Sequence, residues 1–324
     1  MEVVKSVYVP VAADKTGANR AASSMRIHHL DCGSMCPFGG RLMGGAGGPW
    51  TAVPMCCHCL LIESEDGLIL VDSGLGVEDI NSPERLGWPF RLTMRPRLEV
   101  ARTAFRQIAD LGFRVSEVRH IVATHLDLDH AGGICDFPDA KVHVFAPELR
   151  AAQNRSSLAD RDRYRAAHIS AVLNWAPVEL DGESWLGFEA VRPLPRTRDE
   201  VLLIPLIGHT RGHCGVAVRN GAGWLLHCGD AYFHHDEVAT ESGAAPAGLR
   251  LFESIISVDN ETRRANQARL RELARDHIGE VTLVCSHDVS ELAACWAAEP
   301  GSVVPPLRVI PPAALRPAYR TRAG

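Results

Sequence analysis

The sequence lacks a run of about 18 or more apolar residues, the length of a membrane-spanning helix, so no membrane protein is expected. It also lacks an excess of basic residues, since its net charge is −5 and its pI is about 6.3. A groove for nucleic acid is therefore not expected. Residues 1–24 contain no continuous apolar stretch after Lys5, so we expect no secretory signal and a cytoplasmic protein.

The ten cysteines lack a second pair at the spacing of a zinc finger, the nearest candidates being Cys32 and Cys36. The segment Cys56–Cys59 looks like a zinc cluster, but it runs directly into the apolar residues 60–62, which predict a strand. Neighbouring residues of a strand face opposite sides, so the segment would not converge on one ion. We expect reduced thiols that are buried as small apolar side chains.

One stretch of the chain concentrates potential metal ligands. Four of them stand within six residues: His125, Asp127, Asp129 and His130. The apolar pair Ile121-Val122 precedes them and Gly132-Gly133 follows, which predicts a strand, a ligand loop and a helix that starts near the glycines. In an extended loop the first two ligands can face one point and the last two a second point, while Leu126 and Leu128 anchor the loop. His and Asp are suitable ligands for zinc and its first-row neighbours.

This stretch resembles the His-x-His-x-Asp-His signature of the metallo-β-lactamase superfamily. Four further segments resemble the motifs of that superfamily and follow in the same order: Val71-Asp72-Ser73-Gly74, Gly208-His209-Thr210-Arg211-Gly212-His213, Cys228-Gly229-Asp230 and Ser286-His287-Asp288. The resemblance covers roughly residues 25–290, and five ordered segments are more specific than any single one. It is closest to the branch that hydrolyses N-acyl homoserine lactones.

The resemblance implies an α/β fold, namely an αββα sandwich of two mixed β-sheets with helices on the outer faces. The hydrolase domain would span residues 25–300, between an N-terminal extension, 1–24, and a Pro-rich C-terminal tail, 301–324. Apolar runs and turn residues predict the following strands: 25–30, 57–64, 68–72, 141–145, 201–207, 215–219, 224–227 and 281–285. The last ligand motifs thus stand where predicted strands end.

Helical patterns are expected at residues 98–111, 161–173 and 260–276, the second with a solvated charged side. The segment 77–97 contains three prolines and will not form a long helix. It is a candidate lid, substrate-facing loop or dimer contact, and a homodimer is one expected assembly. The segment 39–48 holds six glycines and is expected to be a flexible loop near the mouth of the site.

The resemblance also supplies the grouping of the ligands around two divalent metal ions. His125, Asp127 and His209 would hold the first ion, Asp129, His130 and His287 the second, and Asp230 would bridge both. His213 would orient the site without ligating, and Asp72 would support the metal loop. A hydroxide between two such ions is a strong nucleophile at neutral pH, and an ion can polarise a carbonyl, so no Ser or Cys nucleophile is required.

Asp127 departs from the family pattern, because the family has its second histidine there. A carboxylate adds one negative charge to the first site and favours harder ions, Mn²⁺ or Fe²⁺, over Zn²⁺. Alternatively Asp127 does not ligate and the first site is weak. Zinc is the expected metal elsewhere in the centre.

The leading hypothesis is hydrolysis of a lactone or similar ester, with a small-molecule substrate. Asp129 would help to hold the nucleophile. Tyr232 would donate a hydrogen bond to the substrate, or else be a packed aromatic. The family's tyrosine stands one residue further on, at Phe233. The segments 77–97 and 231–256 would shape an apolar substrate pocket.

Two other functions remain open at this point. The same centre could hydrolyse a phosphoester, organophosphate, thioester or β-lactam, since the fold does not decide the substrate. In a different class, the fold could serve as a metal-bound redox or regulatory scaffold.

Overall fold

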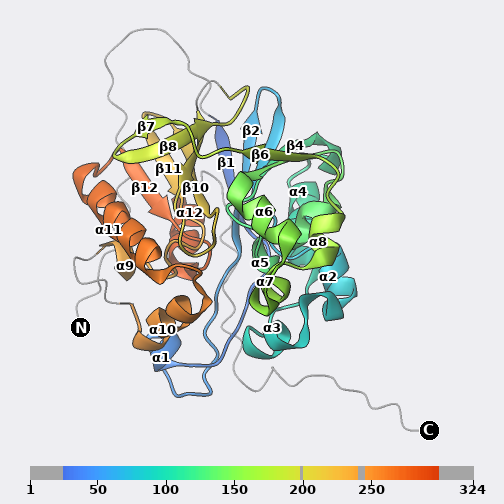
Figure 1. Cartoon of the computed structure of the whole chain (residues 1–324), viewed down its shortest axis with the longest axis vertical. Helices are drawn as coiled ribbons and strands as arrows, with labels where there is room; N and C mark the ends of the chain where they lie inside the picture. Colours follow the sequence, from blue (N-terminus) through green and yellow to red (C-terminus); the bar gives the residue numbers. More distant parts are fainter. Residues whose placement is uncertain (1–24, 198–199, 240–244, 299–324) are drawn as a thin grey trace.

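The computed structural model describes residues 25–197, 200–239 and 245–298 of the chain. The predicted N-terminal extension and Pro-rich tail lie outside the described residues. Two six-stranded sheets face each other (Figure 1). The first sheet contains, in spatial order, β1 (Arg26–Asp31), β2 (His58–Ser64), β3 (Gly67–Val71), β4 (Val118–Val122), β5 (Lys141–Phe145) and β6 (Trp175–Val178). The second sheet contains, in spatial order, β12 (Val281–Val284), β11 (Gly223–His227), β10 (Cys214–Asn220), β9 (Val201–Pro205), β8 (Phe188–Pro193) and β7 (Glu183–Trp185).

Both sheets are mixed. In the first, β1, β2 and β3 pair antiparallel, whereas β3 to β6 run parallel. In the second, β11 and β12 are parallel and the other pairs are antiparallel. Since β9 is antiparallel to β10 and β10 to β11, the strands β9, β11 and β12 share one direction. Their carboxyl ends therefore meet at one edge of the sheet.

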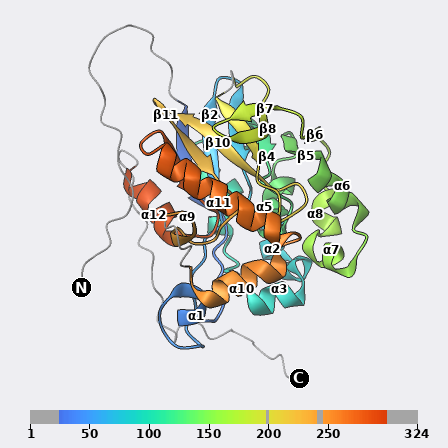
Figure 2. The same ribbon diagram turned by 60° about the vertical axis from the view of Figure 1, so that its left-hand side comes forward.

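Helices cover the outer faces of both sheets (Figure 1). On the first sheet lie α4 (Ala104–Asp110), α6 (Ala146–Asn154) and α8 (Ala166–Ser170). On the second lie α9 (Asp236–Ala239) and the long α11 (Asn260–Asp276), which crosses the sheet in Figure 2. The αββα sandwich is confirmed. Within the described residues, none of the helices combines the length and apolar character that a membrane span requires.

The strand sequences are continuous apolar runs because apolar side chains pack on both faces of each sheet. Leu60 and Ile62 pack between the sheets against Val201 and Leu203, while Leu61, from the same strand, packs outward beneath the helices of the first sheet. Both faces of these strands are covered, so alternation of polar and apolar residues is lost.

Most of the remaining helices lie around the edge at which the ligand strands end, whereas the last of them packs against β1. They are α1 (Arg41–Gly44), α2 (Val77–Asn81), α3 (Trp88–Thr93), α5 (Leu128–Ala131), α7 (Leu158–Arg163), α10 (Ala247–Ile256) and α12 (Val289–Ala298). Short 3₁₀ helices occur at η1 (Pro83–Leu86), η2 (Val100–Arg102), η3 (Val115–Glu117) and η4 (Gly132–Asp136). As expected, the segment 77–97 forms no long helix; the loop predicted at 39–48 contains the short α1.

Two predicted helices are shorter than expected. The helix predicted from residue 98 begins after Thr103, whose hydroxyl accepts a hydrogen bond from the Arg106 amide and caps α4. The helix predicted over 161–173 is broken at Tyr164, which has an extended backbone and a fully buried ring. The helix at 260–276 is confirmed as α11, whereas the sequence did not predict β6, β7 and β8.

Candidate metal centre

The seven predicted ligands converge between the two sheets. Four ligands come from the first sheet: His125 and Asp127 follow β4, and Asp129 and His130 lie in α5. The other three follow strands of the second sheet, His209 after β9, Asp230 after β11 and His287 after β12. The helix starts at Leu128, earlier than predicted, because Asp127 takes the extended conformation of an N-cap residue. Leu126 and Leu128 are buried in separate apolar clusters, as expected for anchors of the loop.

Asp230 stands between two groups of ligands. Its Oδ2 lies 3.7 Å from His125 Nε2 and 3.5 Å from His209 Nε2. Its Oδ1 lies 3.2 Å from both His130 Nε2 and His287 Nε2. Asp129 Oδ2 completes the second group at 3.7 Å from His287 Nε2. We call the group of His125, Asp127 and His209 the first pocket, and the group of Asp129, His130 and His287 the second pocket.

Divalent ions fit this arrangement. Among the described residues, the buried atoms His125 Nε2, His130 Nε2 and Asp230 Oδ1 have no hydrogen-bond partner. Three Nδ1 atoms are already bonded: that of His125 to Thr124 Oγ1 at 2.9 Å, that of His130 to Asp72 at 2.9 Å, and that of His287 to the Cys56 carbonyl at 2.8 Å. This pattern aims each Nε2 inward and is typical of metal-binding histidines.

The charges of the centre are strongly coupled. Burial alone would raise the pKa of Asp230, but His287 and His130 hold it well below its usual value. Burial would lower the pKa of His130, but Asp230 and Asp129 raise it well above its usual value. Burial lowers the pKa of His209 to about 4, against the opposing effect of Asp127. The Asp230 carboxylate is thus ionised and attracts a cation, either a protonated histidine or a metal ion.

The first pocket contains a cation that sequence reasoning missed. Arg163 Nη1 donates to both carboxylate oxygens of Asp127, at 3.1 and 2.9 Å, and lies 3.4 Å from His209 Nε2. Its other terminal nitrogen donates to the Ile256 carbonyl at the end of α10. Although burial would raise the pKa of Asp127, Arg163 and His125 hold it well below its usual value. The side of residues 161–173 predicted to be solvated therefore contributes a cation to the centre.

Three buried side chains hold the ligand loops in place. Asp72, at a left-handed φ of 56°, accepts from the Thr124 amide at 2.7 Å and pairs with His130, which agrees with its expected supporting role. Both ring nitrogens of His213 are bonded, to the Asp230 amide and the Leu206 carbonyl. Glu148, which sequence reasoning missed, accepts from the Leu126 and Gly212 amides at 3.1 and 3.0 Å.

The structure does not bring Tyr232 to the ligands. Its ring is fully buried in the core of the second sheet, and its hydroxyl donates to Glu291 at 3.0 Å. The next residue, Phe233, faces the site instead, with its ring centroid 4.7 Å from that of His287 and 6.1 Å from that of His209. The expected hydrogen bond from Tyr232 to substrate is therefore corrected: this side chain is the packed aromatic.

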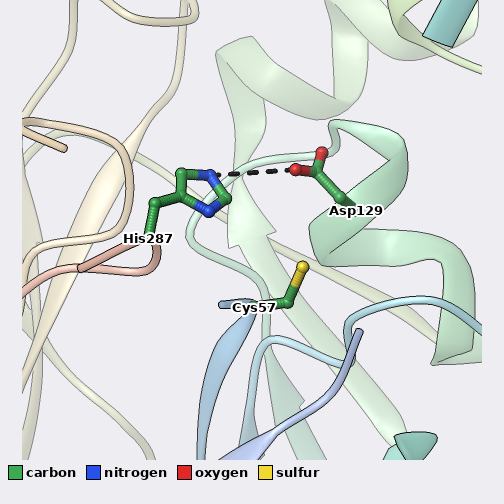
Figure 3. Close-up of side chains that lie close together, drawn as sticks. All are labelled: Cys57, Asp129 and His287. Carbon is green, nitrogen blue, oxygen red and sulfur yellow. Dashed lines mark ion pairs between the residues drawn. The ribbon is translucent and has the colours of Figure 1, made fainter. Parts of the chain in front are cut away.

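The cysteines of the segment 56–59, at the start of β2, do not form a cluster of their own. Cys56 Sγ points to the Ser286 carbonyl, and Cys59 packs in the outer core of the first sheet. All three cysteines of this segment are buried, as expected. Cys57, however, faces the second pocket beside Asp129 and His287 (Figure 3).

A sandwich with a buried His and Asp cluster between its sheets defines a protein built to hold divalent metal ions. The family described as the metallo-beta-lactamase superfamily matches residues 54–287. A Mycobacterium tuberculosis protein named "Probable metallo-hydrolase" is 44% identical over 269 residues, which are 82% of this chain and 80% of that protein. An N-acyl homoserine lactonase of Bacillus thuringiensis is 23% identical over 73% of this chain and 83% of its own length.

Solved structures share the fold. The structure of an N-acyl homoserine lactone hydrolase with the product N-hexanoyl-L-homoserine has a TM-score of 0.63 at 22% identity, covering 83% of this chain and 95% of that one. The chain belongs to the metallo-β-lactamase superfamily and is a metallo-hydrolase.

Proposed function

We propose that this metallo-hydrolase opens a lactone or a similar carboxylic ester that carries an apolar group. The observation that carries the proposal is an apolar cluster directly beside the metal ligands. Its buried members are Met35, Met55, Cys57, Met94, Phe233 and Leu249, and its half-buried members are Met43, Phe90, Phe252 and Ile256. An apolar wall next to a few convergent polar groups is the usual form of a small-molecule site.

The wall comes partly from the two segments predicted to shape the substrate pocket, and partly from residues 35–57. Phe90 and Met94 belong to the segment 77–97, and Leu249 and Phe252 to the segment 231–256. Phe233 joins the wall to the centre, because it packs against both His287 and Phe252. An apolar chain of a substrate would lie here, with its carbonyl towards the ligands.

Each group of the centre has a definite role in this reaction. Two bound divalent ions would activate water and polarise the carbonyl. Asp230 orients ligands of both pockets, since it offers one oxygen to each. Asp129, which is 9% exposed, can accept the proton of an attacking water on a carboxylate oxygen. Phe233 supplies no hydroxyl, so stabilisation of the leaving oxygen would fall to the ions.

The names of relatives add support for the substrate class. Several proteins named N-acyl homoserine lactonase match this chain at 23–28% identity, and a dizinc quorum-quenching lactonase shares the fold with a TM-score of 0.53. The relatives at 44% identity have names that state no substrate. A direct assay separates a lactone substrate from the other substrate classes.

The assay is acid release by the metal-loaded protein from acyl homoserine lactones and from simple γ- and δ-lactones, followed by pH-stat titration. We expect turnover to rise with the length of the acyl chain, because the apolar wall adjoins the ligands. Phosphotriester and thioester substrates serve as the comparison. Rapid cleavage of either, with no turnover of any lactone, would reject the proposal.

Chelation tests the requirement for metal. We expect exhaustive chelation to abolish turnover and added divalent ions to restore it, because the centre is built from His and Asp side chains whose buried atoms His125 Nε2, His130 Nε2 and Asp230 Oδ1 fit ions. Metal content and turnover should be measured in the same samples. Full activity in a preparation verified to be metal-free would contradict the role of the ligands.

A further inference from the structure

We infer that Cys57 supplies a thiolate ligand to the ion of the second pocket. The ligand atoms of Cys57, Asp129 and His287 all lie within 4.8 Å of one another. Figure 3 shows the three side chains directed towards one point from three separate parts of the chain. These are the segment before β2, the helix α5 and the loop after β12.

The cysteine is held rigidly in this position. Its amide donates to Asp31 Oδ1 at 3.2 Å, and its carbonyl accepts from the Cys32 amide at 2.8 Å. The preceding carbonyl, that of Cys56, accepts from His287 Nδ1 at 2.8 Å. One dipeptide therefore both aims the His287 ring and presents a thiol to the same point.

Independent evidence for an ion at this point comes from the other ligands of the second pocket. His130, Asp230 and His287 form another group whose ligand atoms lie within the same distance of one another. Among the described residues, His130 Nε2 and Asp230 Oδ1 are buried without a hydrogen-bond partner. His287 belongs to both groups, so the thiol adjoins the second pocket through this shared ligand.

A thiolate would make the two pockets chemically different. Sulfur is a soft ligand that favours Zn²⁺ and Cd²⁺, whereas the carboxylate of Asp127 favours harder ions. The second pocket would thus retain zinc when the first exchanges it for manganese or iron. This inference concerns metal identity and holds whichever ester is the substrate.

The test is a titration of the full-length metal-free protein with Cd²⁺, recorded by ultraviolet absorption. We expect a thiolate-to-cadmium charge-transfer band that saturates at one thiolate per chain. Cys57→Ser should lose the band and keep its near-ultraviolet circular dichroism. Cys56→Ser is the matched control, because it is adjacent and buried but points to the Ser286 carbonyl, and it should keep the band.

A second measurement needs no variant, which matters if Cys57→Ser does not fold. X-ray absorption of the zinc-loaded wild-type protein should show a sulfur at about 2.3 Å from zinc. A zinc shell of nitrogen and oxygen alone would overturn the inference, and so would a cadmium band that persists in Cys57→Ser. Neither readout depends on lactone turnover, so failure here is distinct from failure of the proposed function.

Discussion

The two pockets share Asp230 but balance their charge in different ways. In the first pocket the carboxylate of Asp127 already has a partner, the Arg163 guanidinium, and the two side chains are 18% and 15% exposed. In the second pocket the groups that face Asp230 Oδ1 are His130 and His287, each with its Nε2 at 3.2 Å. A histidine can give up its proton when an ion binds, whereas the guanidinium of Arg163 keeps its charge. We therefore expect the second pocket to fill first and to bind its ion more tightly.

Asp230→Ala should have the largest effect, because it removes the group that the pockets share. We expect metal affinity and turnover to fall by more than about 100-fold, the upper end of the loss when only a supporting partner is removed. Metal content per chain after dialysis, measured beside turnover, checks this. Asp288→Asn is the control, since Asp288 is buried nearby but bonds to His235. Two ions retained by Asp230→Ala would contradict the bridging position.

Asp72→Asn should weaken the second pocket more than the first, because Asp72 bonds directly to His130 but reaches His125 only through the Thr124 hydroxyl. Asp72 accepts from His130 Nδ1, and loss of such a partner costs about 10–100-fold in metal affinity. Competition with a chromophoric chelator measures each affinity. Asp79→Asn is the matched control, because Asp79 pairs with His168 at 2.8 Å in a buried contact outside the centre. If Asp72→Asn weakened both pockets equally, the two would not be separable.

Arg163→Met should strengthen ion binding in the first pocket. The substitution removes a positive charge close to His209 and frees the Asp127 carboxylate, so we expect an affinity gain of about tenfold or more. The metal-free variant should melt at a lower temperature than wild type, because one member of a largely buried ion pair is removed. Calorimetric titration and thermal melting, with and without ions, check both effects.

Arg161→Met is the control for this variant, because Arg161 is exposed and bonds to the Arg155 carbonyl of the same region. Arg161→Met should change neither the affinity of the first pocket for its ion nor the melting temperature of the metal-free protein. An unchanged first-pocket affinity in Arg163→Met would show that Asp127 does not reach the ion.

Tyr232→Phe should have the smallest effect. It tests whether the Tyr232 hydroxyl belongs to the metal centre or to the core of the second sheet. The hydroxyl lies in the core and donates to Glu291, so we expect kcat within about twofold of wild type and a stability loss of about 1 kcal/mol. Urea unfolding and steady-state kinetics check this. A fall in kcat of about 100-fold, as for a lost oxyanion donor, would return Tyr232 to the active site.

Much of this architecture could be predicted from the chain. The order of the motifs indicated the sandwich, and apolar strands that end at His209, Asp230 and His287 placed those ligands at one edge. The prediction succeeded for these three segments because the conformation of a strand and of the loop that follows it depends on residues close in sequence.

The parts that were missed depend on contacts distant in sequence. Arg163, the last residue of α7, meets Asp127 although the two residues are 36 positions apart in the sequence, and its charged neighbourhood looked like a solvated helix. Tyr232 and Phe233 are adjacent, so a difference of one residue decides which ring faces the ligands. Cys57 was interpreted as a buried thiol, and sequence alone did not show that its side of the strand faces Asp129.

The Glu148 carboxylate has a consequence for how the protein handles its ions. It accepts hydrogen bonds from the backbone amides of two loops, one that carries ligands from the first sheet and one that follows His209 of the second. The centre is therefore preorganised: an incoming ion need not assemble the loops, and binding energy is not consumed in ordering them. We expect the chain to release and recover its ions by exchange within an intact fold, so that their lifetimes depend on the ligands and not on global unfolding.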